Sequence, residues 1–275
     1  MKTKFNLLII IFLFIFSSCS FKSDDSNISI FEKVTYFFED MESIFRKKKT
    51  DDRDILYKNI EKNKDKNDKI NWIYNNFDNL SETDINLVGN DLDLSEFVYN
   101  YNNGIYDFEN YDGESVSFNR LTPYYIQWDN RWAYNRLGSS VIGYAGCGPT
   151  SISMILNRLN PNLDLNPAIL SSDAENYMTD NGIDWSFFTF AANKYGFNIK
   201  TIDLDEDKMI EILKQYPLLI SVNKGYFTLS GHILVIDSYK NGKFIVNDPN
   251  SIKNSEKTWT FNQLKDEIAN IWLLY

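Results

Sequence analysis

Apolar positions change their spacing along this chain of 275 residues, and the changes divide it into three regions. Residues 7–16 form an unbroken apolar run. Across residues 29–103 apolar positions recur every three or four residues, most clearly at 30–45, which is typical of amphipathic helices. From about residue 116 onward, short β-type runs alternate with helical patterns. The pattern therefore predicts a leader, a helical region and a domain of helices and strands.

The domain at 116–275 is predicted to be α+β, because its helical and strand patterns mix and two strand runs flank Lys240, Asn241 and Gly242. An Asn-Gly pair between two apolar runs is typical of a β-hairpin, so at least part of the sheet is antiparallel. The expected strands lie at 218–222, 232–236 and 243–246, and the expected helices at 150–159, 185–195 and 206–215.

The region at 29–115 is interpreted as a helical accessory region. Its segment 46–69 is rich in Lys, Asp and Asn, which predicts a solvated helix face or a loop. Apolar spacing returns at 72–77 and 92–101, and we expect those residues to pack on the domain that follows. The sequence leaves open whether this region inhibits, positions or merely spaces that domain.

The first residues are typical of an export signal. Two lysines precede the apolar run at 7–16, which is too short to span a bilayer but suits the core of a signal peptide. The sequence FSSC at 16–19 resembles a bacterial lipobox, which predicts cleavage after residue 18 and a lipid on the sulfur of Cys19. Phe16 stands where leucine is usual, so an ordinary signal peptide that leaves Cys19 as a free thiol is the alternative.

Either kind of processing predicts an exported protein. Residues 19–28 are mostly small and polar and read as a tether. We expect the lipid to anchor the chain to the bacterial cell envelope. Ser20 stands where an aspartate would indicate inner-membrane retention, which favours the outer membrane in a cell with two membranes.

Composition excludes several kinds of site. The chain has one histidine and two cysteines, too few for a closed zinc tetrahedron or an iron–sulfur cluster. Its 28 lysines and arginines against 38 aspartates and glutamates give a formal charge of −10, which argues against nucleic acid as a partner. A carboxylate-rich calcium or magnesium site stays open. We expect no cofactor and no metal.

Cys147 is the first candidate for chemistry. With Cys19 lipidated, it has no partner for a disulfide inside the chain. It lies in the sequence GCGPTS at 146–151, where Pro149 suits the first position of a helix. Cys147 therefore lies at or just before a helix N-terminus, where free amides and the helix dipole favour a thiolate. The alternative is a buried cysteine with a structural role.

His232 is the only imidazole available to act as a base for that thiolate. It opens the apolar strand at 233–236, so it lies at the edge of a strand and not in the middle of a core. Asp248 ends the next strand in the sequence NDP at 247–249 and could orient the imidazole. By itself, an Asp-Pro pair is also a common turn.

Hairpin register decides whether Asp248 can reach His232. A three-residue loop at 240–242, with Gly242 left-handed, places Asp248 opposite Leu234 and on the same face as His232. A two-residue turn in an unbulged ladder points the carboxylate to the opposite face. We therefore predict the three-residue loop with its bulge.

Gln127 is the fourth candidate and lies in the sequence YIQWDNRW at 125–132. Its side-chain amide is a neutral donor that could stabilise an oxyanion, together with the backbone amide of Cys147. Considered alone, a glutamine beside tryptophans is more often a surface hydrogen-bonder.

Together these motifs resemble the peptidase C39-like family. The resemblance covers about residues 120–273 and rests on QWD with Arg131 and Trp132, GCGPTS, GIDW at 182–185, SGH at 230–232 and NDP. It implies a papain-like cysteine protease fold with an antiparallel sheet and a helix that carries the nucleophile. It also implies Cys147 as nucleophile, His232 as general base and acid, Asp248 as the residue that orients the imidazole, and Gln127 as the oxyanion-hole donor.

The sequence thus predicts a membrane-tethered cysteine hydrolase outside the cytoplasm, acting on a peptide or protein. Two alternatives stay open. One is an amidase or acyltransferase that uses the same residues on cell-wall peptides. The other is a catalytically inactive binding lipoprotein with an aromatic-rich surface.

Overall fold

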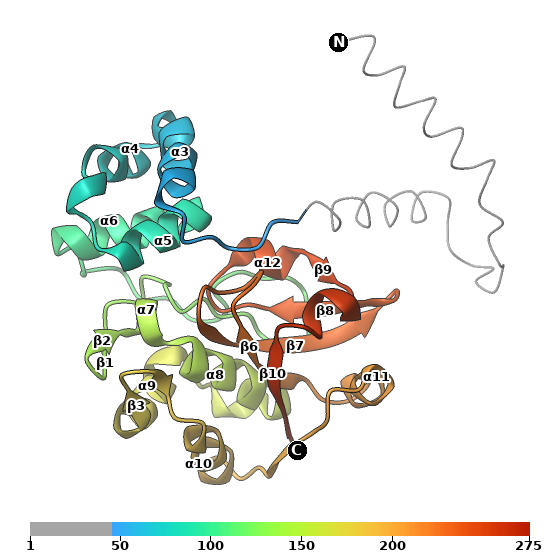
Figure 1. Ribbon diagram of the computed structural model, residues 1–275. Coiled ribbons are helices and arrows are strands. Elements are labelled where there is room, and N and C mark those ends of the chain that lie inside the picture. Colours follow the sequence, from blue (N-terminus) through green and yellow to red (C-terminus); the bar gives the residue numbers. More distant parts are fainter. Residues whose placement is uncertain (1–45) are drawn as a thin grey trace, which may run out of the picture. The chain divides into compact units, whose positions relative to one another are not determined.

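A computed structural model describes residues 46–275. Arg46–Tyr275 form one compact unit, drawn in colour in Figure 1. The predicted signal peptide, Cys19, the tether and the apolar stripe at 30–45 lie outside the described residues. Within 46–275, no helix is long and apolar enough to cross a membrane.

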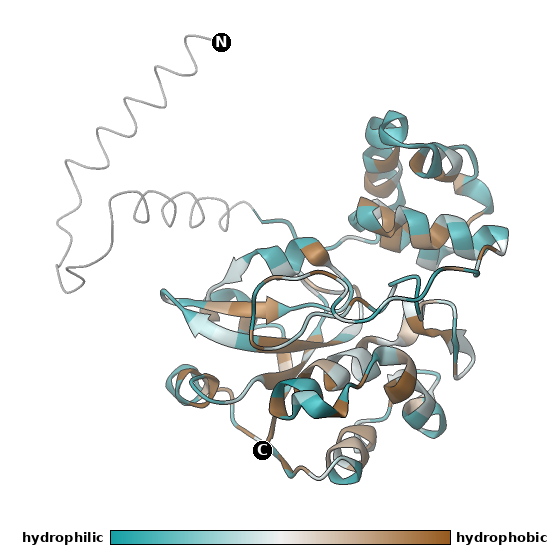
Figure 2. Ribbon diagram, turned by 180° about the vertical axis from the view of Figure 1, so that it is seen from behind, coloured by the Kyte–Doolittle hydropathy of each residue, from teal (hydrophilic) through white to brown (hydrophobic). Residues whose placement is uncertain are grey.

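The predicted helical region is present, and its helices are α3 Arg53–Asn63, α4 Asp68–Asn75, α5 Glu82–Asn90 and α6 Ser95–Asn103. Polar side chains begin three of them: Asp52, Asn67 and Ser81 accept hydrogen bonds from first-turn amides of α3, α4 and α5. Figure 2 shows hydrophilic and hydrophobic residues on these helices, as amphipathic helices require. The apolar faces form a core of their own, which includes Leu56, Ile60, Ile73, Ile85, Val88, Leu94 and Phe97.

The helical region packs on the domain that follows it, as the apolar spacing at 92–101 predicts. The buried Phe97 ring lies 5.6 Å from the Tyr134 ring and 4.8 Å from the Tyr144 ring. Tyr144 also donates its hydroxyl to Asp84 on α5, at 2.5 Å. These contacts fix α5 and α6 against the segment that leads into Cys147.

A six-stranded antiparallel sheet forms the centre of the second domain, in the order β5-β10-β6-β7-β8-β9. The strands predicted at 218–222, 232–236 and 243–246 are confirmed as β6, β7 and β8. The sequence analysis missed β10, which lies inside the sheet between β5 and β6. The bounds are β5 Ile199–Thr201, β6 Leu218–Asn223, β7 Gly231–Lys240, β8 Lys243–Asn247, β9 Thr258–Trp259 and β10 Ile268–Leu274.

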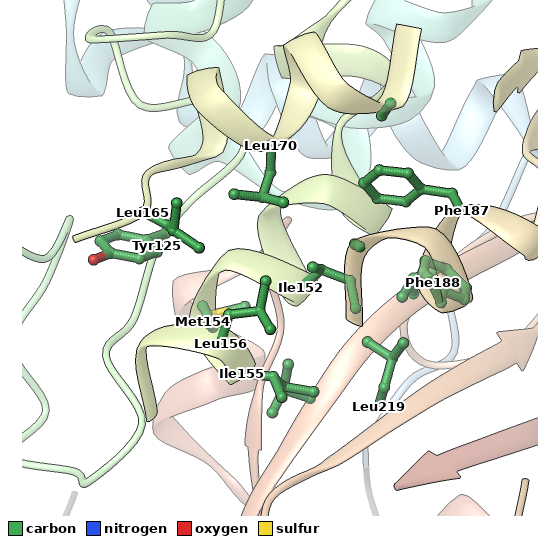
Figure 3. Packing of buried hydrophobic residues seen from close by; sticks show 14 of the residues in the cluster. Tyr125, Ile152, Met154, Ile155, Leu156, Leu165, Leu170, Phe187, Phe188 and Leu219 are labelled. Carbon is green, nitrogen blue, oxygen red and sulfur yellow. The ribbon is translucent and has the colours of Figure 1, made fainter. Parts of the chain in front are cut away.

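Alternate strand residues enter two cores, one on each face of the sheet. Ile233 and Val235 pack with α8 Cys147–Leu159, α9 Pro167–Ala174 and α10 Ser186–Lys194, the core drawn in Figure 3. Leu234 and Ile236 pack with α11 Glu206–Leu213 and α13 Phe261–Leu264. The sheet is therefore buried on both faces, and β7 carries continuous apolar sequence.

The shorter elements are β1 Arg136–Leu137, β2 Ser140–Val141, α7 Ile142–Ala145, β3 Met178–Thr179, β4 Gly182–Ile183 and α12 Ile252–Glu256.

The hairpin between β7 and β8 differs from the predicted three-residue loop. Lys240 pairs with Lys243, so Asn241 and Gly242 form a two-residue turn. Both have positive φ, 53° and 77°, because asparagine tolerates the left-handed conformation almost as glycine does. The register then shifts between Ile236 and Ser238, where Asp237 is the extra residue of a β-bulge.

That bulge has the effect we had expected from the loop. Beyond it, Ile236 pairs with Val246 and Val235 with Asn247. This is the pairing that we predicted for the end of the hairpin that leads to Asp248. The prediction was wrong about the turn and about the place of the bulge, and the register next to the candidate site is as predicted.

The contact between the helical region and the second domain leaves no room for a side chain at Gly143. A Cβ there would lie 2.3 Å from the ring of Phe97. We expect Gly143→Ala to lower the free energy of unfolding by about 1–3 kcal/mol, because the ring must move out of a filled core. Urea denaturation followed by tryptophan fluorescence measures this. Gly231→Ala is the control, since nothing lies within 4 Å of its Cβ, and equal midpoints for the two variants would contradict the prediction.

Candidate active site

Helix α8 begins at Cys147, with Gly146 as its N-cap, which places the thiol at a helix N-terminus as predicted. Pro149 is the third helical residue and not the first. The position tolerates proline because the first i→i−4 bond of the helix runs from Thr150 N to Gly146 O, at 2.9 Å. Cys147 is partly exposed, so the structural alternative of a fully buried cysteine does not describe it.

His232 lies at the start of β7, opposite Val222 on β6, and its imidazole lies close enough to the Cys147 thiol for each group to shift the pKa of the other. Ser151 in the first turns of α8 donates its hydroxyl to the carbonyl of Ile233, at 3.1 Å. This bond ties the N-terminal part of α8 to the beginning of β7. The thiol and the imidazole therefore approach each other from two elements that are bonded beside the site.

Asp248 completes the contact chain. Its carboxylate is fully buried, and Oδ1 lies 2.7 Å from His232 Nε2. Because Nε2 faces the carboxylate, the other ring nitrogen, Nδ1, is left for the thiol. Asp248 Oδ1 also accepts from the backbone N–H of Asn250 at 2.9 Å, and Oδ2 accepts from Asn254 Nδ2 at 2.8 Å. Both carboxylate oxygens thus have donors, as a buried carboxylate requires.

Two supports of Asp248 were missed by the sequence analysis. Asn254 lies on α12, and Tyr124 donates its buried hydroxyl to the carbonyl of Asp248, at 2.8 Å. Asparagine and tyrosine are frequent in this chain, so neither stood out. The segment that follows Asp248 could have drawn attention, because a buried carboxylate needs donors other than the histidine.

The ionisation of the three groups favours a thiolate beside an imidazolium. Burial raises the pKa of the Cys147 thiol, but the contact with His232 and backbone hydrogen bonds from Ile233 and Gly148 outweigh it and lower the pKa overall. Burial lowers the pKa of His232, but the charge of Asp248 and contacts with Asp248 and Cys147 raise it to about 9. Burial also raises the pKa of Asp248, but the charge and hydrogen bond of His232, the charge of Lys49 and the hydrogen bond from Asn254 together lower it overall.

Gln127 lies beside these residues and is 2% exposed. Its backbone N–H donates to Pro249 O at 2.8 Å, and its Nε2 donates to Gly143 O at 2.9 Å. The bond to Gly143 fixes which end of the amide carries the nitrogen. The second hydrogen on Nε2 remains for an oxyanion, which suits the role that the resemblance implies.

Cys147, His232 and Gln127 all line one cleft of about 260 Å³. Residues 227–232 and Tyr144 form walls contributed by the second domain. The sequence analysis did not expect a further wall from the helical region, which contributes Lys49, Thr83, Asn86 and Leu87. No cluster of three His, Cys, Asp or Glu side chains suited to a metal occurs in the described part of the chain.

Family comparison agrees with the motifs. The model of the Peptidase_C39 like family matches residues 121–275. This chain belongs to the C39-like peptidase family. The fold expected from that resemblance is confirmed, with mixed helices, an antiparallel sheet and a helix that carries the cysteine. No curated protein matches the chain.

Solved structures with similar folds include three peptidases. The peptidase domain of Streptococcus ComA, a bi-functional ABC transporter, is 20% identical with a TM-score of 0.36, and the match covers 51% of this chain and 97% of that domain. A double glycine motif protease from an AMS/PCAT transporter, solved with a leader peptide, is 15% identical with a TM-score of 0.36. The match covers 60% of this chain and 96% of that protease. A C39-like peptidase from Bacillus anthracis is 14% identical with a TM-score of 0.34, covering 56% and 94%.

Reactivity of the thiol tests the contact chain directly. In a Cys19→Ser form, which leaves Cys147 as the single thiol, we expect iodoacetamide to react at pH values well below about 8.5, the pKa of a free cysteine. The reason is that His232 stabilises the thiolate. In His232→Ala the rate should rise only near or above that pH. The unfolded chain in urea is the control, and a wild-type profile that matches it would contradict the prediction.

Proposed function

We propose that this C39-like family member is a cysteine peptidase that cleaves amide bonds with Cys147, His232, Asp248 and Gln127. The observation that carries the proposal is that Cys147, at a helix N-terminus, and His232 line one cleft, and that His232 Nε2 lies 2.7 Å from the buried Asp248 carboxylate. Nucleophile, base and orienting group lie in the order that covalent catalysis needs.

Acylation starts from the Cys147 thiolate and the His232 imidazolium. The sulfur attacks the amide carbon, and the carbonyl electrons move onto oxygen. Gln127 Nε2–H and the backbone N–H of Cys147 hold that oxyanion. The imidazolium gives its proton to the nitrogen of the leaving amine, the C–N bond breaks, and a thioester remains on Cys147.

Deacylation uses the same groups. The neutral imidazole takes a proton from water, and the resulting hydroxide attacks the thioester carbon. Collapse of the second tetrahedral intermediate breaks the C–S bond, releases a carboxylic acid product and restores the thiolate–imidazolium pair. Asp248 stabilises the imidazolium in both halves and stays ionised throughout.

Hydrolysis of a mixed peptide library, analysed by mass spectrometry, tests the activity, with peptidoglycan fragments assayed alongside. We expect new amine and acid termini from the wild type and none from Cys147→Ala. Gln127→Ala and Gln127→Glu should each lower kcat by about 10²–10³, because neither can donate the amide hydrogen.

Gln215→Ala is the matched control, since this glutamine is exposed at the end of α11, and it should retain full activity. Circular dichroism shows whether each variant is folded. Peptide cleavage that persists in Cys147→Ala would overturn the proposal. Release confined to peptidoglycan fragments would favour the amidase alternative.

We also propose that the protein is exported and is anchored to a membrane by a lipid on Cys19. The support is sequence alone: the apolar run at 7–16 and the sequence FSSC that ends at Cys19. Mass spectrometry of the mature chain should find a lipid-modified N-terminal cysteine and no residues 1–18. Cys19→Ser should move the protein from the membrane fraction to the soluble fraction. An unmodified cysteine in the mature wild-type chain would contradict the tether.

A further inference from the structure

The wall that the helical region adds to the cleft is held rigidly at Lys49. The backbone N–H of Lys49 donates to Gly225 O at 2.8 Å, which anchors it to the second domain. The next residue, Thr50, exchanges two hydrogen bonds with the side chain of Asn90 at the end of α5, at 2.9 and 2.8 Å. The backbone at Lys49 is therefore fixed between the two parts of the protein, and Lys49 lines the cleft together with Cys147.

Lys49 supplies the only Lys or Arg charge among the residues that line this cleft, and no aspartate or glutamate lines it. Its neighbours are neutralised, since Lys48 pairs with Glu267 at 3.3 Å and Lys224 pairs with Asp51 at 2.8 Å. Lys49 has no ion pair with any residue in 46–275. In a chain with a formal charge of −10, a cleft whose lining adds one lysine and no carboxylate to the Cys147 thiolate–His232 imidazolium pair favours a substrate with negative charge.

Three side-chain amides in the same cleft present oxygens without donors. They are Asn86 Oδ1 on α5, Gln127 Oε1 and Asn250 Oδ1, each buried and without a hydrogen bond in the described structure. Buried acceptors of this kind normally have partners. The backbone N–H groups of an extended peptide are donors of the right chemistry. The cleft lining thus combines three residues with buried amide oxygens that lack donors in the described structure and one lysine that has no ion pair there.

We propose that Lys49 binds a carboxylate of the substrate next to the cleaved amide, so that the preferred substrates are peptides with an acidic side chain or a free C-terminus at that place. The inference rests on the proposed function for the nature of the reaction. Lys49 is then a specificity-determining residue, and the helical region is part of the substrate-binding site.

A different role for Lys49 makes a different prediction. The charge of Lys49 also lowers the pKa of Asp248, so the residue could act only by stabilising that carboxylate. Loss of such an effect would slow the reaction of charged and neutral substrates alike. Loss of a carboxylate-binding residue slows only the substrates that carry the carboxylate.

Alkylating probes test the site without requiring turnover. The probes are iodoacetyl-Glu amide, iodoacetyl-Gln amide and iodoacetyl-Gln with a free α-carboxylate, and they react with Cys147 in the full-length Cys19→Ser chain. We expect at least one acidic probe to react about 5- to 50-fold faster than the neutral one, as expected for a charge-assisted contact at a half-buried site. Which acidic probe is faster separates an acidic side chain from a C-terminus.

Substitution at Lys49 identifies the origin of that preference. Lys49→Gln should remove it, so that the acidic and neutral probes react with that variant at rates within about twofold of each other, and Lys49→Glu should reverse it. Lys47→Gln, an equal charge change at an exposed residue outside the cleft lining, is the control and should keep the preference. A wild type without preference, or a preference that survives in Lys49→Gln, overturns the proposal.

Peptide hydrolysis separates this inference from the proposed function. Peptides that the library assay shows to be cleaved are made in Glu and Gln pairs, each with a free and with an amidated C-terminus. We expect Lys49→Gln to lower kcat/KM more for the members that carry the recognised carboxylate than for their neutral partners. If the probes show the Lys49-dependent preference and no peptide is cleaved, the peptidase proposal fails and the carboxylate site stands. If peptides are cleaved with equal kcat/KM for Glu and Gln members and for free and amidated C-termini, the carboxylate site fails and the peptidase stands.

Discussion

The buried hydrogen bond between His232 and Asp248 is the contact on which the candidate site depends. A fully buried carboxylate is costly unless it is paired and hydrogen-bonded, so the surrounding structure has to supply several donors. Asn254 and the backbone of Asn250 bind the carboxylate, and Tyr124 and Ser255 bind the backbone of Asp248. The loop after β8 and the short helix α12 therefore supply most of the hydrogen bonds that stabilise this buried charge and its backbone.

These donors can bind Asp248 beside His232 only because the register of β7 against β8 places Asp248 there. The bulge at Asp237 corrects the register that the Asn241–Gly242 turn imposes, by one residue. Asp237 is itself buried and accepts from the backbone of Thr122 and the hydroxyl of Ser238. A local irregularity in β7 is thus stabilised by its own hydrogen bonds, and it determines which side chains meet beyond it.

The helical region is joined to the rest of the chain by polar as well as apolar contacts. Phe97 fills the space that Gly143 leaves, Tyr144 donates to Asp84, and Ser251 donates to Asp91 at 2.8 Å. Ser251 lies just after the segment that holds Asp248. The same contacts that hold the helices in place therefore also support the loop of the candidate site.

Local sequence determined the elements and the chemistry of this protein. Apolar spacing located α8, α10, α11 and three strands, because each element must bury one face or both. Cys147 and His232 stood out as candidates because the chain has one histidine and two cysteines, and Asp248 and Gln127 were identified from the motifs around them. The short spacing within each motif also carried the family resemblance.

Only the tertiary structure decided how these pieces meet. The two-residue turn and the bulge at Asp237 together set the register of β7 against β8. Where the bulge lies depends on tertiary packing, which the spacing of apolar residues does not encode. Strand β10 lies inside the sheet because of pairing with β5 and β6, which are distant in sequence. Asn254, Lys49 and the wall from α5 reach the cleft through long-range contacts, so no local pattern marks them. A cleft is made where separate segments pack together, and its lining is therefore a property of the folded chain.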